Sequence, residues 1–96
     1  MEATIIVRHN PAASRYEAEV EGRRVTTEYT RQGDVLVFHH TFVPPGLRGR
    51  GIAQQLVRNA LEDVRLQRLR IVPQCTYVAA FIRRNPEFQS LVAPAP

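Results

Sequence analysis

The chain has 96 residues, a formal net charge of +4 and 44% apolar residues. This length and apolar content predict one domain over residues 1–96 with a single modest core, and they exclude a disordered chain and a two-domain protein. Because no apolar run approaches the roughly 20 residues of a membrane span, we expect no contact with a membrane. The single cysteine, Cys75, excludes an internal disulfide, so the expected compartment is the reducing cytoplasm.

The first half of the chain predicts four strands, over residues 4–8, 15–21, 24–30 and 35–43. In the second of them Tyr16, Ala18 and Val20 alternate with glutamates, which is typical of a strand with one exposed face. Turn signals, among them Gly22 and Gly33, separate the strands. Four strands joined by tight turns predict an antiparallel meander.

After residue 43 the pattern changes to that of a helix. Ile52, Leu56 and Ala60 recur at four-residue spacing and predict the apolar face of an amphipathic helix. A short apolar strand over 69–72 and a second helix over 75–84 follow. A strand, a helix and a strand in this order favour a right-handed crossover to a parallel neighbour. The expected fold is therefore α/β, with a mostly antiparallel sheet, one crossover helix and a second, C-terminal helix.

The turn between the fourth strand and the first helix reads F-V-P-P-G-L-R-G-R-G-I-A over residues 42–53. The free N–H groups and the dipole of a helix start favour an anion, and glycines let a phosphate approach the backbone. Arg48 and Arg50 could grip phosphate oxygens in bidentate geometry. This segment predicts a site for a diphosphate-bearing ligand, and a tight basic turn without a ligand is the alternative interpretation.

The run Arg48-Gly49-Arg50-Gly51-Ile52-Ala53 resembles the Arg/Gln-x-x-Gly-x-Gly/Ala signature of the GCN5-related N-acetyltransferase superfamily. His40-Thr41, Pro73-x-Cys75 and Tyr77-Val78 resemble motifs of its minimal, single-domain members. The resemblance implies the fold of that superfamily, acetyl-coenzyme A as cofactor and a pantetheine arm beside the fourth strand. The cofactor-binding residues that it implies are Phe42, Val43, Leu47, Arg48, Gly49, Arg50, Gly51, Ile52 and Ala53.

Three side chains are candidates for acid–base or covalent chemistry. His40 could accept the proton of an amine, because an imidazole titrates near neutral pH; sharing a strand face with Phe38 and Phe42, it could instead be a core histidine. Cys75 could accept the acetyl group or protonate the leaving thiolate, or be a small buried residue. Tyr77 could be the acid instead, or a packed aromatic residue. No metal site is predicted.

The preferred function is an acetyl-coenzyme A-dependent N-acetyltransferase that acts on an amine of a protein, peptide or polyamine, as a monomer or homodimer. Transfer is expected to be direct, with an acetyl-Cys75 intermediate as the second route. A non-catalytic coenzyme A-binding or regulatory module is an alternative, because 96 residues leave little room for the family's acceptor-binding elements. An arginine-rich nucleic-acid-binding domain ranks last, because the arginines are dispersed among acidic residues with few aromatic residues between them.

Overall fold

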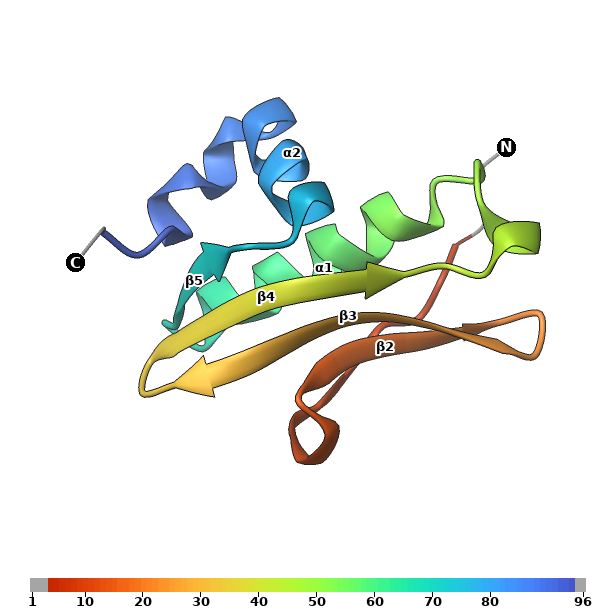
Figure 1. Cartoon of the computed structure of the whole chain (residues 1–96), viewed down its shortest axis with the longest axis horizontal. Coiled ribbons are helices and arrows are strands. Elements are labelled where there is room, and N and C mark those ends of the chain that lie inside the picture. Colours follow the sequence, from red (N-terminus) through yellow and green to blue (C-terminus); the bar gives the residue numbers. More distant parts are fainter. Residues whose placement is uncertain (1–3, 95–96) are drawn as a thin grey trace.

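The computed structural model describes residues 4–94, which form a five-stranded sheet with helices packed against one of its faces (Figure 1). The strands are β1 (Arg8–Asn10), β2 (Arg15–Val20), β3 (Arg23–Gln32), β4 (Val35–Phe42) and β5 (Arg70–Pro73). The helices are α1 (Ile52–Leu66) and α2 (Thr76–Arg84), with short 3₁₀ turns η1 (Pro11–Ala13), η2 (Pro45–Leu47) and η3 (Pro86–Leu91). None of the helices within residues 4–94 is long and apolar enough to cross a membrane.

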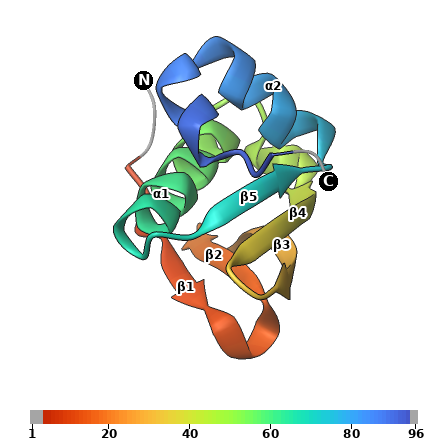
Figure 2. The same ribbon diagram turned by 90° about the vertical axis from the view of Figure 1, so that its left-hand side faces the viewer.

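The sheet has the strand order of the sequence, β1-β2-β3-β4-β5. Neighbours from β1 to β4 pair antiparallel, while β5 returns through α1 and pairs parallel with β4, at Val35↔Arg70 through Phe38↔Pro73. The predicted meander, the crossover and the α/β class are therefore confirmed. Figure 2, which views the sheet from one end, shows α1 on one face and α2 beside it above β5.

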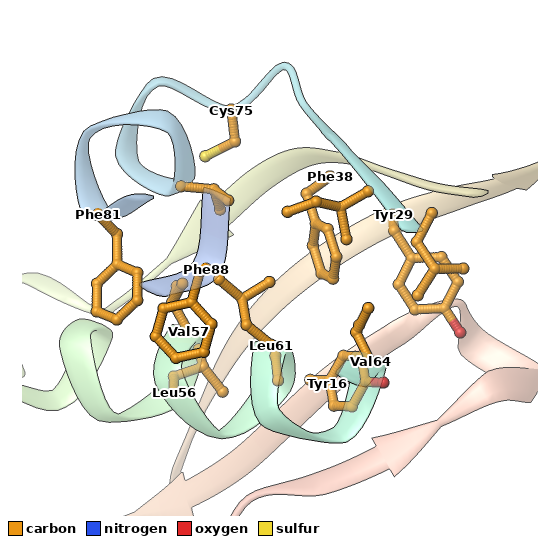
Figure 3. Packing of buried hydrophobic residues seen from close by; sticks show 14 of the residues in the cluster. Tyr16, Tyr29, Phe38, Leu56, Val57, Leu61, Val64, Cys75, Phe81 and Phe88 are labelled. Atoms are coloured by element: carbon orange, nitrogen blue, oxygen red, sulfur yellow. The ribbon is translucent and has the colours of Figure 1, made fainter. Parts of the chain in front are cut away.

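The core lies between α1 and this covered face of the sheet. Every fourth or third residue of α1, including Leu56, Ala60 and Val64, is buried, as the predicted helical face requires. Opposite them are fully buried strand residues such as Val25 and Leu36. Figure 3 shows how the aromatic rings of the strands and of the C-terminal segment meet the aliphatic side chains of α1.

The predicted first strand over residues 4–8 is wrong, because β1 begins only at Arg8 and pairs with the first half of β2. Residues 4–7 lie outside the sheet. There Ile5 and Val7 pack against the core, and the Ile5 N–H donates to the Gln55 side chain of α1 at 3.2 Å. The apolar run thus indicated burial only for Ile5 and Val7, which are partly buried, whereas Ile6 is 81% exposed. A side chain of the helix takes a backbone bond that a strand would have made.

A cluster of polar rings connects β1 to α1. The His9 and Tyr16 rings are stacked with centroids 4.2 Å apart, and His9 Nε2 lies 2.7 Å from the Tyr29 hydroxyl. The Tyr16 hydroxyl donates to Asp63 of α1 at 2.6 Å, and the other ring nitrogen of His9 lies 3.7 Å from the same carboxylate. Burial lowers the pKa of His9, although Asp63 opposes that shift.

A β-bulge interrupts β4. Tyr29 of β3 pairs with Phe38 and Glu28 pairs with His40, so His39 is an extra residue without a partner in the register. Beyond the bulge the alternation of faces is shifted by one. The prediction that His40 and Phe38 share a strand face is therefore wrong: Phe38 is buried in the core, and His40 is exposed on the uncovered face.

The segment after α2 was not predicted as an ordered element, yet η3 packs back onto α1. Phe88 is fully buried beside Phe81 of α2, with ring centroids 5.6 Å apart. The guanidinium of Arg58 lies over both rings, and Arg65 lies over Phe88 at 5.0 Å from the ring centroid. These contacts hold α2 against α1 and so determine where the start of α2 lies.

Candidate functional site

A pocket opens where β4 and β5 separate. Their pairing ends at Phe38, whose carbonyl accepts the Cys75 N–H at 2.8 Å, whereas β4 continues to Phe42 beside β3 alone. The pocket has a volume of about 430 Å³ and lies between the end of β4, the following loop and the first residues of both helices. Its lining consists of Thr41, Val43, Leu47, Arg48, Gly49, Gly51, Ile52, Ala53, Gln54 and Tyr77.

The start of α1 forms one end of the pocket. Gly51 is the N-cap residue in the left-handed region, at φ +75°, and contributes no side-chain cap. The first helical bond is from the Gln55 N–H to the Gly51 carbonyl, so the N–H groups of residues 52–54 precede the helical ladder. The first turn contains no acidic residue. This arrangement has the dipole and free donors that suit an anion.

The two arginines of the loop are held in different places. Arg48 lines the pocket, and its Nε donates to the Val43 carbonyl at 2.8 Å. Arg50 instead forms an ion pair with Glu21 in the β2–β3 turn and donates to the Gly46 carbonyl at 3.3 Å. The structure therefore brings Arg48 to the predicted anion site and directs Arg50 away from it, because a carboxylate distant in sequence binds that guanidinium.

Two of the predicted catalytic residues, Tyr77 and Cys75, lie on the pocket side of the sheet. Tyr77 lines the pocket, and its partial burial raises the pKa of its phenol. Cys75 is the N-cap residue of α2, is only 9% exposed and does not belong to the pocket lining. Its Sγ lies 3.4 Å from the Thr41 hydroxyl oxygen. Tyr77 is thus in contact with the pocket space, while Cys75 lies behind Thr41.

His40 and Phe42 lie on the other face of the sheet. Their rings are stacked with centroids 6.4 Å apart, and Phe42 is 41% exposed. Neither residue lines the pocket, so the structure does not bring these predicted site residues together with Tyr77. Thr41 takes the place expected for His40. The His40-Thr41 motif already included Thr41, but no catalytic role was predicted for it, because only the bulge reveals which of the two side chains faces the pocket.

The residues suited to metal binding are dispersed. Within residues 4–94 no group of three His, Cys, Asp or Glu side chains is arranged to hold a metal ion. The polar groups of the pocket lining are instead a guanidinium, an amide, two hydroxyls and backbone N–H groups. Such groups bind anions and carbonyl oxygens by hydrogen bonding.

Comparisons with known proteins agree on one family. The profile of the GCN5-related N-acetyl-transferase family matches residues 15–91. Protein NATD1 from Bos taurus is 34% identical over 85 residues, which cover 85% of this chain and 75% of that protein. Protein NATD1 from Homo sapiens is 32% identical, with the same coverage. The solution structure of a GCN5-like protein from Staphylococcus aureus matches the fold with a TM-score of 0.70 at 15% identity, covering 95% of this chain and 90% of that one.

Proposed function

This chain belongs to the GCN5-related N-acetyltransferase family, and from that premise we propose that it transfers the acetyl group of acetyl-coenzyme A to an amine. The observation that carries the proposal is the composition of the pocket. Its lining combines the uncapped start of α1 and Arg48 with the hydroxyl side chains of Thr41 and Tyr77. Apolar Val43 and Leu47 lie in the same lining. A ligand with a diphosphate, a flexible arm and a thioester matches this arrangement.

The loop and the helix start would hold the pyrophosphate. The N–H groups of residues 52–54 would donate to its oxygens, with Arg48 adding a charge-assisted hydrogen bond. Gly49 and Gly51 leave the backbone accessible, since neither carries a side chain. Beside them, Val43, directly after the end of β4, would lie along the pantetheine arm, and the next residue, Pro44, cannot resume strand pairing because it has no N–H donor.

In the proposed reaction a neutral amine attacks the thioester carbonyl carbon, a C–N bond forms and the C–S bond breaks. Tyr77 would donate the proton to the leaving thiolate, since its raised pKa keeps the phenol protonated at neutral pH. The described pocket lining contains no imidazole and no carboxylate. After attack, the nitrogen would therefore lose its proton to water, and the Tyr77 phenolate would regain a proton from water. We do not include His40 as the base.

Direct transfer is favoured over an acetyl-Cys75 intermediate, because Cys75 is buried and lies behind Thr41. The lack of a titratable base in the described lining favours a second candidate, a coenzyme A-binding module without turnover. For the acceptor we propose an amine of a protein, peptide or polyamine, encountered by a monomer or homodimer in the cytoplasm.

The test combines binding and turnover. Acetyl-coenzyme A should raise the melting temperature while ATP should not, and release of free thiol should require an added amine. Tyr77→Phe should lower kcat by about 100-fold, as for a lost general acid, without weakening coenzyme A binding. No binding of acetyl-coenzyme A would refute both candidates, whereas binding without turnover across a panel of amines would favour the second.

A further inference from the structure

A chain of three polar side chains leads from the core to the pocket. Thr27 of β3 is fully buried, and its hydroxyl oxygen lies 2.9 Å from that of Thr41. The Thr41 hydroxyl in turn lies 3.4 Å from Cys75 Sγ. The two threonines meet because they are directly paired across β3 and β4, and Cys75 reaches them from the start of α2, at the border of the core cluster in Figure 3.

The direction of these hydrogen bonds follows from the number of donors and acceptors. A hydroxyl has one hydrogen and two acceptor positions. Thr41 is the only hydrogen-bond partner of the Thr27 side chain among the described residues, and no buried side-chain nitrogen or oxygen there lacks a partner. A fully buried hydroxyl needs an acceptor for its hydrogen, so Thr27 donates to Thr41.

Cys75 occupies the second acceptor position. A thiol is a weak donor and a weaker acceptor than a hydroxyl oxygen, so the favourable direction is from the Cys75 thiol to Thr41. With both acceptor positions filled by Thr27 and Cys75, the hydrogen of Thr41 is left for a third partner. Because Thr41 lines the pocket, this hydrogen is available to a group that enters the pocket.

We propose that Thr41 is the donor that binds the acyl carbonyl oxygen of the thioester, and that Thr27 and Cys75 are positioning residues that fix its hydrogen toward the pocket. This inference rests on the proposed function. As the amine attacks, negative charge grows on the carbonyl oxygen, and a donor already oriented toward it stabilises the transition state without reorganisation. The role of Cys75 is then to donate its thiol hydrogen to Thr41, and no covalent bond forms at its sulfur.

The experiment compares variants of nearly equal size in the full chain. Thr41→Val removes the hydroxyl and should lower kcat/KM by about 100-fold, the effect of removing one oxyanion donor, while Thr41→Ser should restore most of it. Thr27→Val and Cys75→Ala each remove one hydrogen bond to the Thr41 hydroxyl. Each variant should therefore lower kcat about threefold to tenfold, which is the effect of one neutral hydrogen bond, and leave KM unchanged. Cys75→Ser keeps a donor and should stay within about threefold of the wild type.

Binding provides a readout that a merely structural role would not change. Wild-type protein should bind acetyl-coenzyme A about fivefold more tightly than coenzyme A, because only the former offers the carbonyl. Thr41→Val should abolish that difference and leave the affinity for coenzyme A nearly unchanged, while the melting temperature falls because the buried Thr27 hydroxyl loses its acceptor. Full activity in Thr41→Val, or a loss of kcat in Cys75→Ser equal to that in Cys75→Ala, would overturn the inference while the proposed function stands. If the wild type fails to bind acetyl-coenzyme A, the inference is overturned together with the proposed function.

Discussion

Substituting alanine for Gly49 separates the role of the loop in ligand binding from its role in folding. Gly49 has φ +80° and Gly33, in the β3–β4 turn, has φ +62°, and a Cβ at either would meet nothing within 4 Å. The cost to folding is therefore backbone strain alone, about 1–2 kcal/mol for an L-residue in the left-handed region. Both variants should melt at temperatures roughly 4–16 °C below the wild type, since about 1 kcal/mol corresponds to about 4–8 °C at this size.

Only Gly49 lines the pocket, so ligand affinity should distinguish the two variants. A methyl group at Gly49 would keep a phosphate from the backbone donors of the loop. Losing one hydrogen bond to a charged group costs about 1.5–3 kcal/mol, which is about a 10- to 100-fold increase in Kd. Calorimetric titration with acetyl-coenzyme A, well below both melting temperatures, should show this loss in Gly49→Ala and wild-type affinity in Gly33→Ala. Equal affinities would refute the assignment of the loop as the pyrophosphate site.

Three further predictions concern histidine and tyrosine side chains. His40→Ala should leave the pH profile of kcat/KM unchanged, rising with deprotonation of the amine, and a changed profile in this variant would restore His40 as the base. Burial lowers the pKa of His9 below 6.5, so the stability that neutral His9 contributes is complete above that pH and is lost as pH falls toward the lowered pKa. His9→Gln should therefore flatten the acid side of the curve of melting temperature against pH. An unchanged curve would contradict this role of His9. Tyr16→Phe removes the donor to Asp63 and should lower the free energy of unfolding by about 1.5–2 kcal/mol in urea titrations, and a loss below about 0.5 kcal/mol would contradict the hydrogen bond.

Local patterns predicted the elements of the fold because they arise from contacts close in sequence. The four-residue spacing from Ile52 onward fixed the buried face of α1, and the turns at Gly22 and Gly33 separated the strands as the structure has them. The glycines also predicted the start of α1, whose N-cap is Gly51, whereas anion binding by this loop stays a prediction. These features depend on backbone conformation and on one helix end, both of which a short segment determines by itself.

Features that depend on distant partners were not predictable in this way. Nothing near Arg50 in the sequence indicates that Glu21, 29 residues earlier, binds its guanidinium. The same holds for η3, whose Phe88 is buried against Phe81 of α2 and beneath the guanidinium groups of Arg58 and Arg65 of α1. Propensity describes such a segment as a loop, whereas tertiary packing makes it an ordered part of the core.

The bulge in β4 has the largest consequence for function, since one extra residue exchanges the side chains on the two faces of the strand. With strict alternation from Phe38, His40 would face the core and Thr41 the solvent. With His39 unpaired in the register, Thr41 instead turns toward Thr27 and the pocket, and His40 turns outward beside Phe42. The bulge begins at the residue where β4 loses β5 as its partner. At this one point of the strand, β4 and β5 separate to open the pocket, and the change of faces brings the Thr41 hydroxyl into it. A donor to a carbonyl, which needs orientation but no titration, is the chemistry that this shift provides in place of a base.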